Sequence, residues 1–112
     1  MKRVYFAMLL LLLSFSVHAG NAAEGKTKAM QGKEGERCSD CHGAEGNKPN
    51  GADRPILAGQ HYDYLVRSLK EYKSGKRNNA QMSGPAQRLS QKDIEDLAAW
   101  FASQKSSLKD QR

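Results

Sequence analysis

The clearest helical pattern along the chain lies between residues 61 and 74. Apolar side chains recur there at intervals of three or four positions, with charged side chains between them. Lys73 stands near the negative end of this segment, and Gly75 follows as a C-terminal cap. The pattern predicts an amphipathic helix over 61–74 whose buried stripe contains Tyr62, Leu65, Val66, Leu69 and Tyr72.

A second amphipathic pattern runs from residue 91 to residue 104. Ser90 precedes it, and Asp93 takes the place that glutamate usually holds in a capping box. Trp100 flanks the apolar stripe of this segment. The predicted buried side of the helix contains Ile94, Leu97, Ala98 and Phe101.

The remaining predicted elements are shorter. We expect a first helix over 22–30, a helical turn over 38–42 and a short helix over 85–89. The stretch 43–51 is rich in glycine and asparagine and predicts a loop. No segment alternates apolar and polar residues as a half-buried strand does, so the predicted fold class is all-α.

The N-terminal segment has the composition of an export signal. Two basic residues precede an apolar run over 4–13, and small residues occur at 17 and 19. The run is too short to span a bilayer, which needs about 20 apolar residues. We therefore predict a secretory signal peptide over 1–19 and export to the periplasm, with no stable membrane insertion after cleavage. Cleavage after Ala23 and an uncleaved anchor are the alternatives.

The charge of the mature chain is mildly basic. Without residues 1–19 the chain has 16 basic and 12 acidic residues, a net charge of +4. Such a balance favours association with an acidic partner or a membrane-bound complex. Nucleic acid is not a predicted partner, because its recognition needs clustered basic residues together with base-stacking aromatic residues.

The sequence Cys38-Ser39-Asp40-Cys41-His42 carries the candidate chemistry. Two cysteines separated by two residues, with a histidine directly after the second, are the attachment signature of c-type haem. Each sulfur adds to one haem vinyl group, and the histidine can supply an axial nitrogen to the iron.

Three other kinds of site can also contain a CxxC pair. An exported disulfide remains open, since only two cysteines are present. A thioredoxin-like redox pair would need a βαβ pattern around the motif, which the sequence lacks. A structural zinc site needs four ligands, and beyond the motif the mature chain offers only His61.

The order of elements resembles that of class I cytochromes c. It is similar, more narrowly, to the small bacterial cytochromes c553 and to single domains of cytochrome c4. The resemblance implies a monohaem domain over 20–112, with three to five short helices around one covalently bound haem c. It implies that Cys38 and Cys41 form the thioethers, that His42 is the proximal iron ligand and that Met82 is the distal one.

The same resemblance assigns roles to residues outside the motif. It implies that the Pro55 carbonyl accepts a hydrogen bond from the proximal imidazole and that Leu57 packs on the haem. It also implies a crossing of the first and last helices, for which Gly25 and Phe101 are the candidate contacts. The segment 31–37 is longer and more polar than the family pattern.

Two other residues compete with Met82 for the distal position. Met82 stands alone in the polar segment 76–84, so its side chain is predicted to point inward, as packing or as a ligand. Met30 belongs to the first helix, where packing is the ordinary role. His61 would give bis-histidine ligation, but it opens the helix at 61–74, where a half-exposed polar residue is common.

The function implied is that of a monomeric one-electron carrier and not of an enzyme. Transient docking to membrane-bound or periplasmic redox proteins is expected. A patch of Arg67, Lys70, Lys76 and Arg77 is either a docking surface or an ordinary solvated helix face. The alternatives are a peroxidase or gas-binding protein with a labile distal ligand, and a fixed subunit of a respiratory complex.

Overall fold

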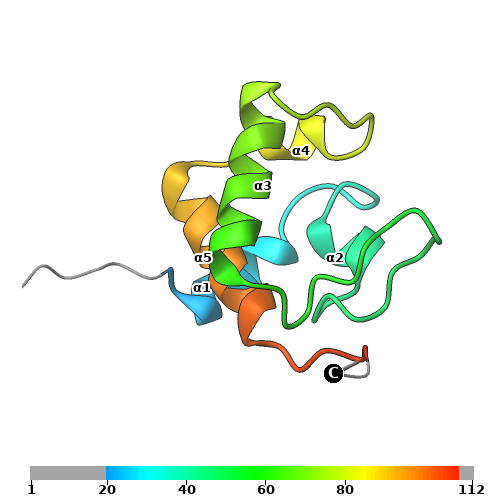
Figure 1. The fold of residues 1–112 in the computed structure, drawn as a ribbon. Coiled ribbons are helices and arrows are strands. Elements are labelled where there is room, and N and C mark those ends of the chain that lie inside the picture. Colours follow the sequence, from blue (N-terminus) through cyan, green and yellow to red (C-terminus); the bar gives the residue numbers. More distant parts are fainter. Residues whose placement is uncertain (1–19, 109–112) are drawn as a thin grey trace, which may run out of the picture.

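The structure is a computed structural model that describes residues 20–108. The predicted signal peptide over 1–19 lies outside the described residues. Within them the chain forms helices and no strand, which confirms the all-α class (Figure 1). The helices are α1 (Ala22–Ala29), α2 (Cys38–His42), α3 (Tyr62–Ser74), α4 (Ser83–Gln87) and α5 (Gln91–Ser103).

The crossing of α1 and α5 depends on one glycine. A Cβ at Gly25 would lie 1.9 Å from the Asp96 carbonyl oxygen and 2.9 Å from Trp100 Cβ. No other residue fits there without separating the helices, which confirms Gly25 as a contact of the crossing. The atoms nearest to that position belong to Asp96 and Trp100. The Phe101 ring lies against Gly46 in the loop after α2, and Phe101 shares the buried core cluster with Ala29 of α1, so its part in the crossing stays a prediction.

The core forms where α3 packs against α5 beside the helix crossing. Ile94 and Leu97 of α5 are each only 1 % exposed, as the sequence pattern predicts. From α3, Leu65 is buried, and Tyr62, Val66 and Leu69 of its predicted stripe pack against the core while remaining partly exposed. Tyr72, the last member of that stripe, is also partly exposed. Figure 1 shows α1, α3 and α5 grouped on one side, with α2 and its loops on the other.

The sequence predicted the start of α5 better than the start of α4. The Ser90–Asp93 capping box at the start of α5 is present, with both reciprocal hydrogen bonds. The prediction of a helix over 85–89 was displaced by two residues, because α4 begins at Ser83 with Met82 as its N-cap. Pro85 falls in the first turn, where a missing N–H group breaks no helical hydrogen bond.

Candidate haem site

The short helix α2 presents both cysteines of the motif. Cys38 and Cys41 are three positions apart, so their side chains share one face of the helix. Both are free thiols and partly buried, which does not favour the disulfide alternative. Burial raises the pKa of the Cys38 thiol, so this group is protonated at neutral pH.

Asp40, one of the two residues between the cysteines, fixes the start of α2. Its carboxylate accepts hydrogen bonds from the backbone N–H groups of Gly35 (2.7 Å) and Arg37 (3.1 Å). The Arg37 side chain also donates to the Gly32 carbonyl oxygen, at 3.2 Å. These bonds order the long polar segment 31–37 directly before the motif. This role of Asp40 was not predicted from the sequence, although an acidic residue in the first turn of a helix is a recognisable signal.

The loop after α2 satisfies the carbonyl groups at the end of that helix. Lys48 N–H donates to the His42 carbonyl oxygen (3.2 Å), and Asn50 N–H donates to that of Cys41 (2.9 Å). Gly43 makes this reversal, with a φ of +88°. A Cβ there would lie 2.9 Å from Lys48 N, so both conformation and space require glycine.

His42 is the buried member of the motif, at 4 % exposed. Its Nδ1 lies 2.9 Å from the Pro55 carbonyl oxygen, in the contact that the family resemblance implies. A carbonyl oxygen only accepts hydrogen bonds, so Nδ1 carries the proton and the lone pair is on Nε2. A neutral imidazole with a free Nε2 is the form that binds a metal ion.

The surroundings of His42 keep it in that form. Burial lowers the pKa of the imidazole, and the hydrogen bond to Pro55 opposes part of this effect. The positive charge of Arg54 lowers the pKa further. Arg54 directly precedes Pro55, whose carbonyl oxygen contacts His42, so it lies near the motif. The Arg54 Nε is buried and has no hydrogen-bond partner among the described residues. His42 is therefore uncharged at neutral pH.

Leu57 belongs to the loop that also supplies Pro55. It is half-buried against the core, and its N–H donates to the Gly46 carbonyl oxygen at 2.9 Å. The Trp100 indole of α5 donates to the Ala44 carbonyl oxygen, at 3.0 Å. The loop on the His42 side is therefore fixed to α5 by the Trp100 hydrogen bond and to itself by the bond between Leu57 and Gly46.

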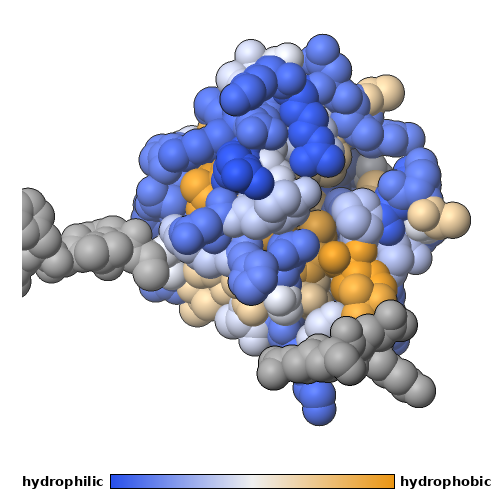
Figure 2. Space-filling view, in the orientation of Figure 1, coloured by the Kyte–Doolittle hydropathy of each residue, from blue (hydrophilic) through white to orange (hydrophobic). Residues whose placement is uncertain are grey.

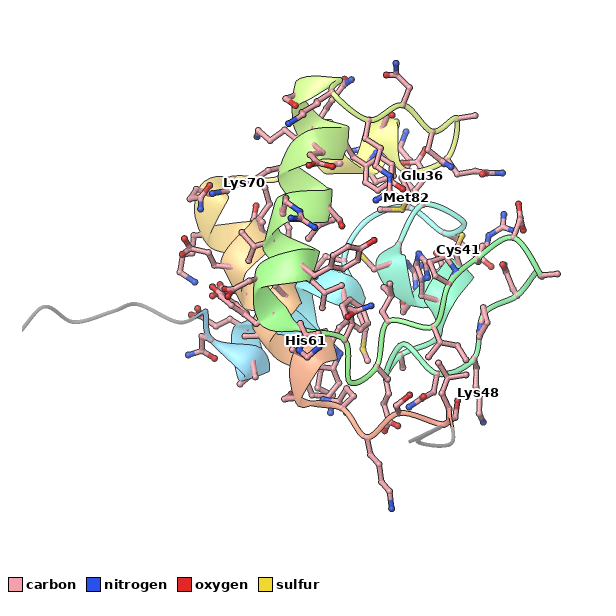
Figure 3. All side chains as sticks on the ribbon, viewed as in Figure 1. Glu36, Cys41, Lys48, His61, Lys70 and Met82 are labelled. Atoms are coloured by element: carbon pink, nitrogen blue, oxygen red, sulfur yellow. The ribbon has the colours of Figure 1, made fainter. Side chains whose placement is uncertain are left out.

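Met82 belongs to a different part of the chain, at the start of α4. It is partly buried at the N-terminus of α4, on the side of α3 that faces α2 (Figure 3). His61 is exposed at the opposite end of α3, far from the labelled Met82 and Cys41. Met30, the other rival, is 40 % exposed at the end of α1.

The donor set fits haem better than a metal ion held by protein alone. Among residues 20–108 no group of three or more His, Cys, Asp or Glu side chains could hold a metal ion. Figure 2 shows hydrophobic residues in the centre and lower right of one face, surrounded by hydrophilic ones. Partly exposed apolar side chains pack against the core, and they include Cys38 of the motif together with Leu57, Tyr62, Val66 and Leu69.

Comparison with known proteins identifies the family. A model of the family described as cytochrome c matches residues 22–105. The chain belongs to the cytochrome c family. Members bind haem c covalently, and Cys38, Cys41 and His42 form the haem-binding motif of this cytochrome.

Its relatives include longer and similar-sized cytochromes. The chain is 42 % identical over 110 residues to cytochrome c4 of Pseudomonas aeruginosa, covering 96 % of this chain and 51 % of that protein. It is 40 % identical over 89 residues to cytochrome c-554(548) of Halomonas halodenitrificans, covering 77 % and 99 %. The crystal structure of reduced recombinant cytochrome c4 from Pseudomonas stutzeri matches with a TM-score of 0.69 at 36 % identity, over 80 % of this chain and 48 % of that one.

The chain spans about half the length of the cytochromes c4 that it matches. These likenesses confirm the resemblance to a single cytochrome c4 domain and the helical fold around a haem site. No helix within residues 20–108 is long and apolar enough to cross a membrane.

Proposed function

We propose that this cytochrome is a periplasmic one-electron carrier whose haem iron is held between His42 and Met82. The observation that carries the proposal is the His42 geometry. The imidazole is buried, neutral and oriented by the Pro55 carbonyl oxygen, with Nε2 left for a metal. Met82 lies on the opposite wall, on the side of α3 that faces the attachment helix.

Each protein group has a defined part in this proposal. The Cys38 and Cys41 sulfurs would form the thioethers, His42 Nε2 and Met82 Sδ would hold the iron, and Leu57 would pack on the porphyrin. When bound, the haem iron supplies the reversible one-electron change. A thioether ligand and apolar surroundings both favour the ferrous state, because that state carries less positive charge.

Two filled axial positions leave no place for a substrate. The proposed function is therefore electron transfer and not catalysis, in line with the cytochromes c4 that the chain resembles. The peroxidase or gas-binding alternative requires Met82 to leave the iron. A fixed place in a respiratory complex is the other candidate, but no observation in the described residues favours it.

The charge distribution favours docking through the surface that α3, α4 and the segment between them form, called the α3–α4 wall below. Residues 64–89 contain six basic residues and one acidic residue, so the net charge of this segment is +5. That exceeds the net charge of +4 of the whole mature chain. Arg67, Lys70, Lys76 and Arg77 take part in none of the ion pairs among the described residues. A weak, salt-sensitive encounter with an acidic redox protein suits such a surface.

Replacing Met82 by alanine tests the axial assignment. The ferrous variant is expected to bind carbon monoxide readily, while the ferrous wild type binds it poorly, because only the variant has an open position. The measurement is a carbon monoxide titration followed in the visible spectrum. Met30→Ala is the matched control and is expected to behave like wild type. Equal binding by wild type and Met82→Ala would contradict the assignment.

A further inference from the structure

The segment that carries Met82 has little apolar burial of its own. Residues 75–81 are all exposed, and they connect the end of α3 to the start of α4. The segment begins with anchors to α3. Arg77 N–H donates to the Glu71 carbonyl oxygen at 3.1 Å, and the Arg77 guanidinium lies 4.8 Å from the Tyr72 ring centroid. Beyond Arg77, the path to Met82 depends on hydrogen bonds within the segment.

Asn79 closes the segment into a ring with Ser83. Asn79 Oδ1 accepts hydrogen bonds from Gln81 N–H (2.9 Å) and from Met82 N–H (3.0 Å). Asn79 N–H donates to Ser83 Oγ, and Ser83 N–H donates to the Asn79 carbonyl oxygen, both at 3.0 Å. Four hydrogen bonds thus enclose Ala80, Gln81 and Met82.

The other side of Met82 is tied to the core. Its carbonyl oxygen accepts a hydrogen bond from Ala86 N–H at 3.0 Å, and Ala86 is 0 % exposed. The backbone of Met82 is therefore held at its N–H by the Asn79 side chain and at its carbonyl by a buried residue. Only the rotatable bonds of the methionine side chain remain free.

We infer that Asn79 is a positioning residue for the distal ligand, acting through the Met82 backbone. This inference rests on the proposed ligation by Met82. A methionine sulfur reaches the iron only if its long side chain starts from a fixed point, since ordering a free segment costs conformational entropy. The Asn79–Ser83 ring removes much of that cost before ligation. An external ligand such as imidazole then competes poorly for the sixth position.

Asn78 offers a matched control for the test. It is the neighbouring asparagine, equally exposed, and its side chain makes no hydrogen bond within residues 20–108. The experiment titrates ferric wild type, Asn79→Ala and Asn78→Ala with imidazole. It also records the weak far-red band that marks methionine ligation. Because loss of a side chain that accepts hydrogen bonds from backbone N–H groups weakens local structure, as loss of a helix cap does, Asn79→Ala is expected to bind imidazole about fivefold more tightly than wild type.

Three further comparisons separate positioning from general stability. Asn78→Ala is expected to match wild type, and so is Asn79→Asp, whose carboxylate still accepts both N–H groups. Ser83→Ala removes the hydrogen bond from Asn79 N–H to Ser83 Oγ and leaves the Asn79 side chain in place. It is expected to move imidazole binding in the same direction as Asn79→Ala. The thermal midpoint of each variant is measured in parallel.

The experiment distinguishes failure of the inferred Asn79 role from failure of the proposed Met82 ligation. A wild type without the far-red band would show that Met82 is not the ligand and would remove the basis of the inference. A wild type with the band, together with equal imidazole affinity in Asn79→Ala and Asn78→Ala, would overturn the role of Asn79 alone. Asn79→Asp behaving like Asn79→Ala would overturn it as well.

Discussion

Single buried polar groups determine how this small domain is held together. Asp96 is only 5 % exposed, and its carboxylate accepts a hydrogen bond from Asn21 N–H at 2.8 Å and another from Lys92. Burial would raise the pKa of Asp96, but these bonds outweigh it and hold the pKa below its ordinary value. The charged form is thus the stable one where α1 begins against α5.

Replacing Asp96 by asparagine is expected to lower the free energy of unfolding at pH 7 by about 1–3 kcal/mol, the usual loss for a buried charged hydrogen bond. Because the folded pKa is lowered, the carboxylate contributes stability above its unfolded pKa of about 4 and loses it as pH falls through the folded value. The difference between wild type and variant should therefore shrink in acid. Denaturant unfolding of both holoproteins at a series of pH values measures it.

Glu95→Gln is the control, because Glu95 adjoins Asp96 on α5 and bonds only to Gln91 among the described side chains. It is expected to leave the pH dependence unchanged. An Asp96→Asn difference that persists undiminished at low pH would contradict the account.

Much of the site could be predicted at this scale because its chemistry needs fixed residue types. Cys38, Cys41 and His42 follow from their spacing, and the structure places the Pro55 carbonyl oxygen on His42 Nδ1. Asp40 and Asn79 were missed because their roles are hydrogen bonds to the backbone. The neighbouring Asn78 is of the same type and lies in the same exposed segment, yet its side chain has no such partner within residues 20–108, so residue type alone does not reveal the role.

Among the elements, α3 and α5 were predictable because their apolar stripes repeat over 13 residues each. The start of α4 was not, since five residues give no periodicity and Pro85 can occupy any position of a first turn. The contact of Phe101 with the loop around Gly46 could not be predicted, because an apolar stripe shows which residues are buried and not which segment covers them.

The crossing of α1 and α5 gives a sharp prediction at this scale. Gly25→Ala places a methyl group 1.9 Å from the Asp96 carbonyl oxygen, so the helices must move apart. We expect destabilisation of about 3 kcal/mol, at the upper end of overpacking in a core. Thermal unfolding of the holoprotein measures it.

Gly84→Ala is the control within another helix. A Cβ at Gly84 meets no atom within 4 Å. Because alanine is the better helix former, this variant should match wild type or be more stable by about 0.5–1 kcal/mol. Equal stability of the Gly25→Ala and Gly84→Ala proteins would show that the crossing is not close-packed at Gly25.

For the whole molecule, the uneven distribution of charge gives a test that needs no natural partner. Electron exchange with an anionic reagent such as ferricyanide should be fast at low ionic strength and slow as salt is added. Reversing the charge of Lys70, which lies on the α3 wall, should lower the rate by about threefold at low salt.

Lys48→Glu makes the same change in net charge at a different place, in the loop after α2. It is expected to have the smaller effect, because its charge lies outside the basic segment. A cationic reagent should show the opposite order of rates. Equal effects of the two charge reversals would contradict docking through the α3–α4 wall.

The most direct test of the central claim is a visible spectrum of the purified mature protein, oxidised and then reduced. We expect sharp α and β bands on reduction that survive acid–acetone extraction, because the haem is covalently bound through Cys38 and Cys41. We also expect a weak far-red band in the oxidised form, as methionine ligation gives. A covalent haem spectrum without that band would contradict His42–Met82 ligation. A protein without haem, from a host that matures c-type cytochromes, would contradict the proposal that this protein is an electron carrier.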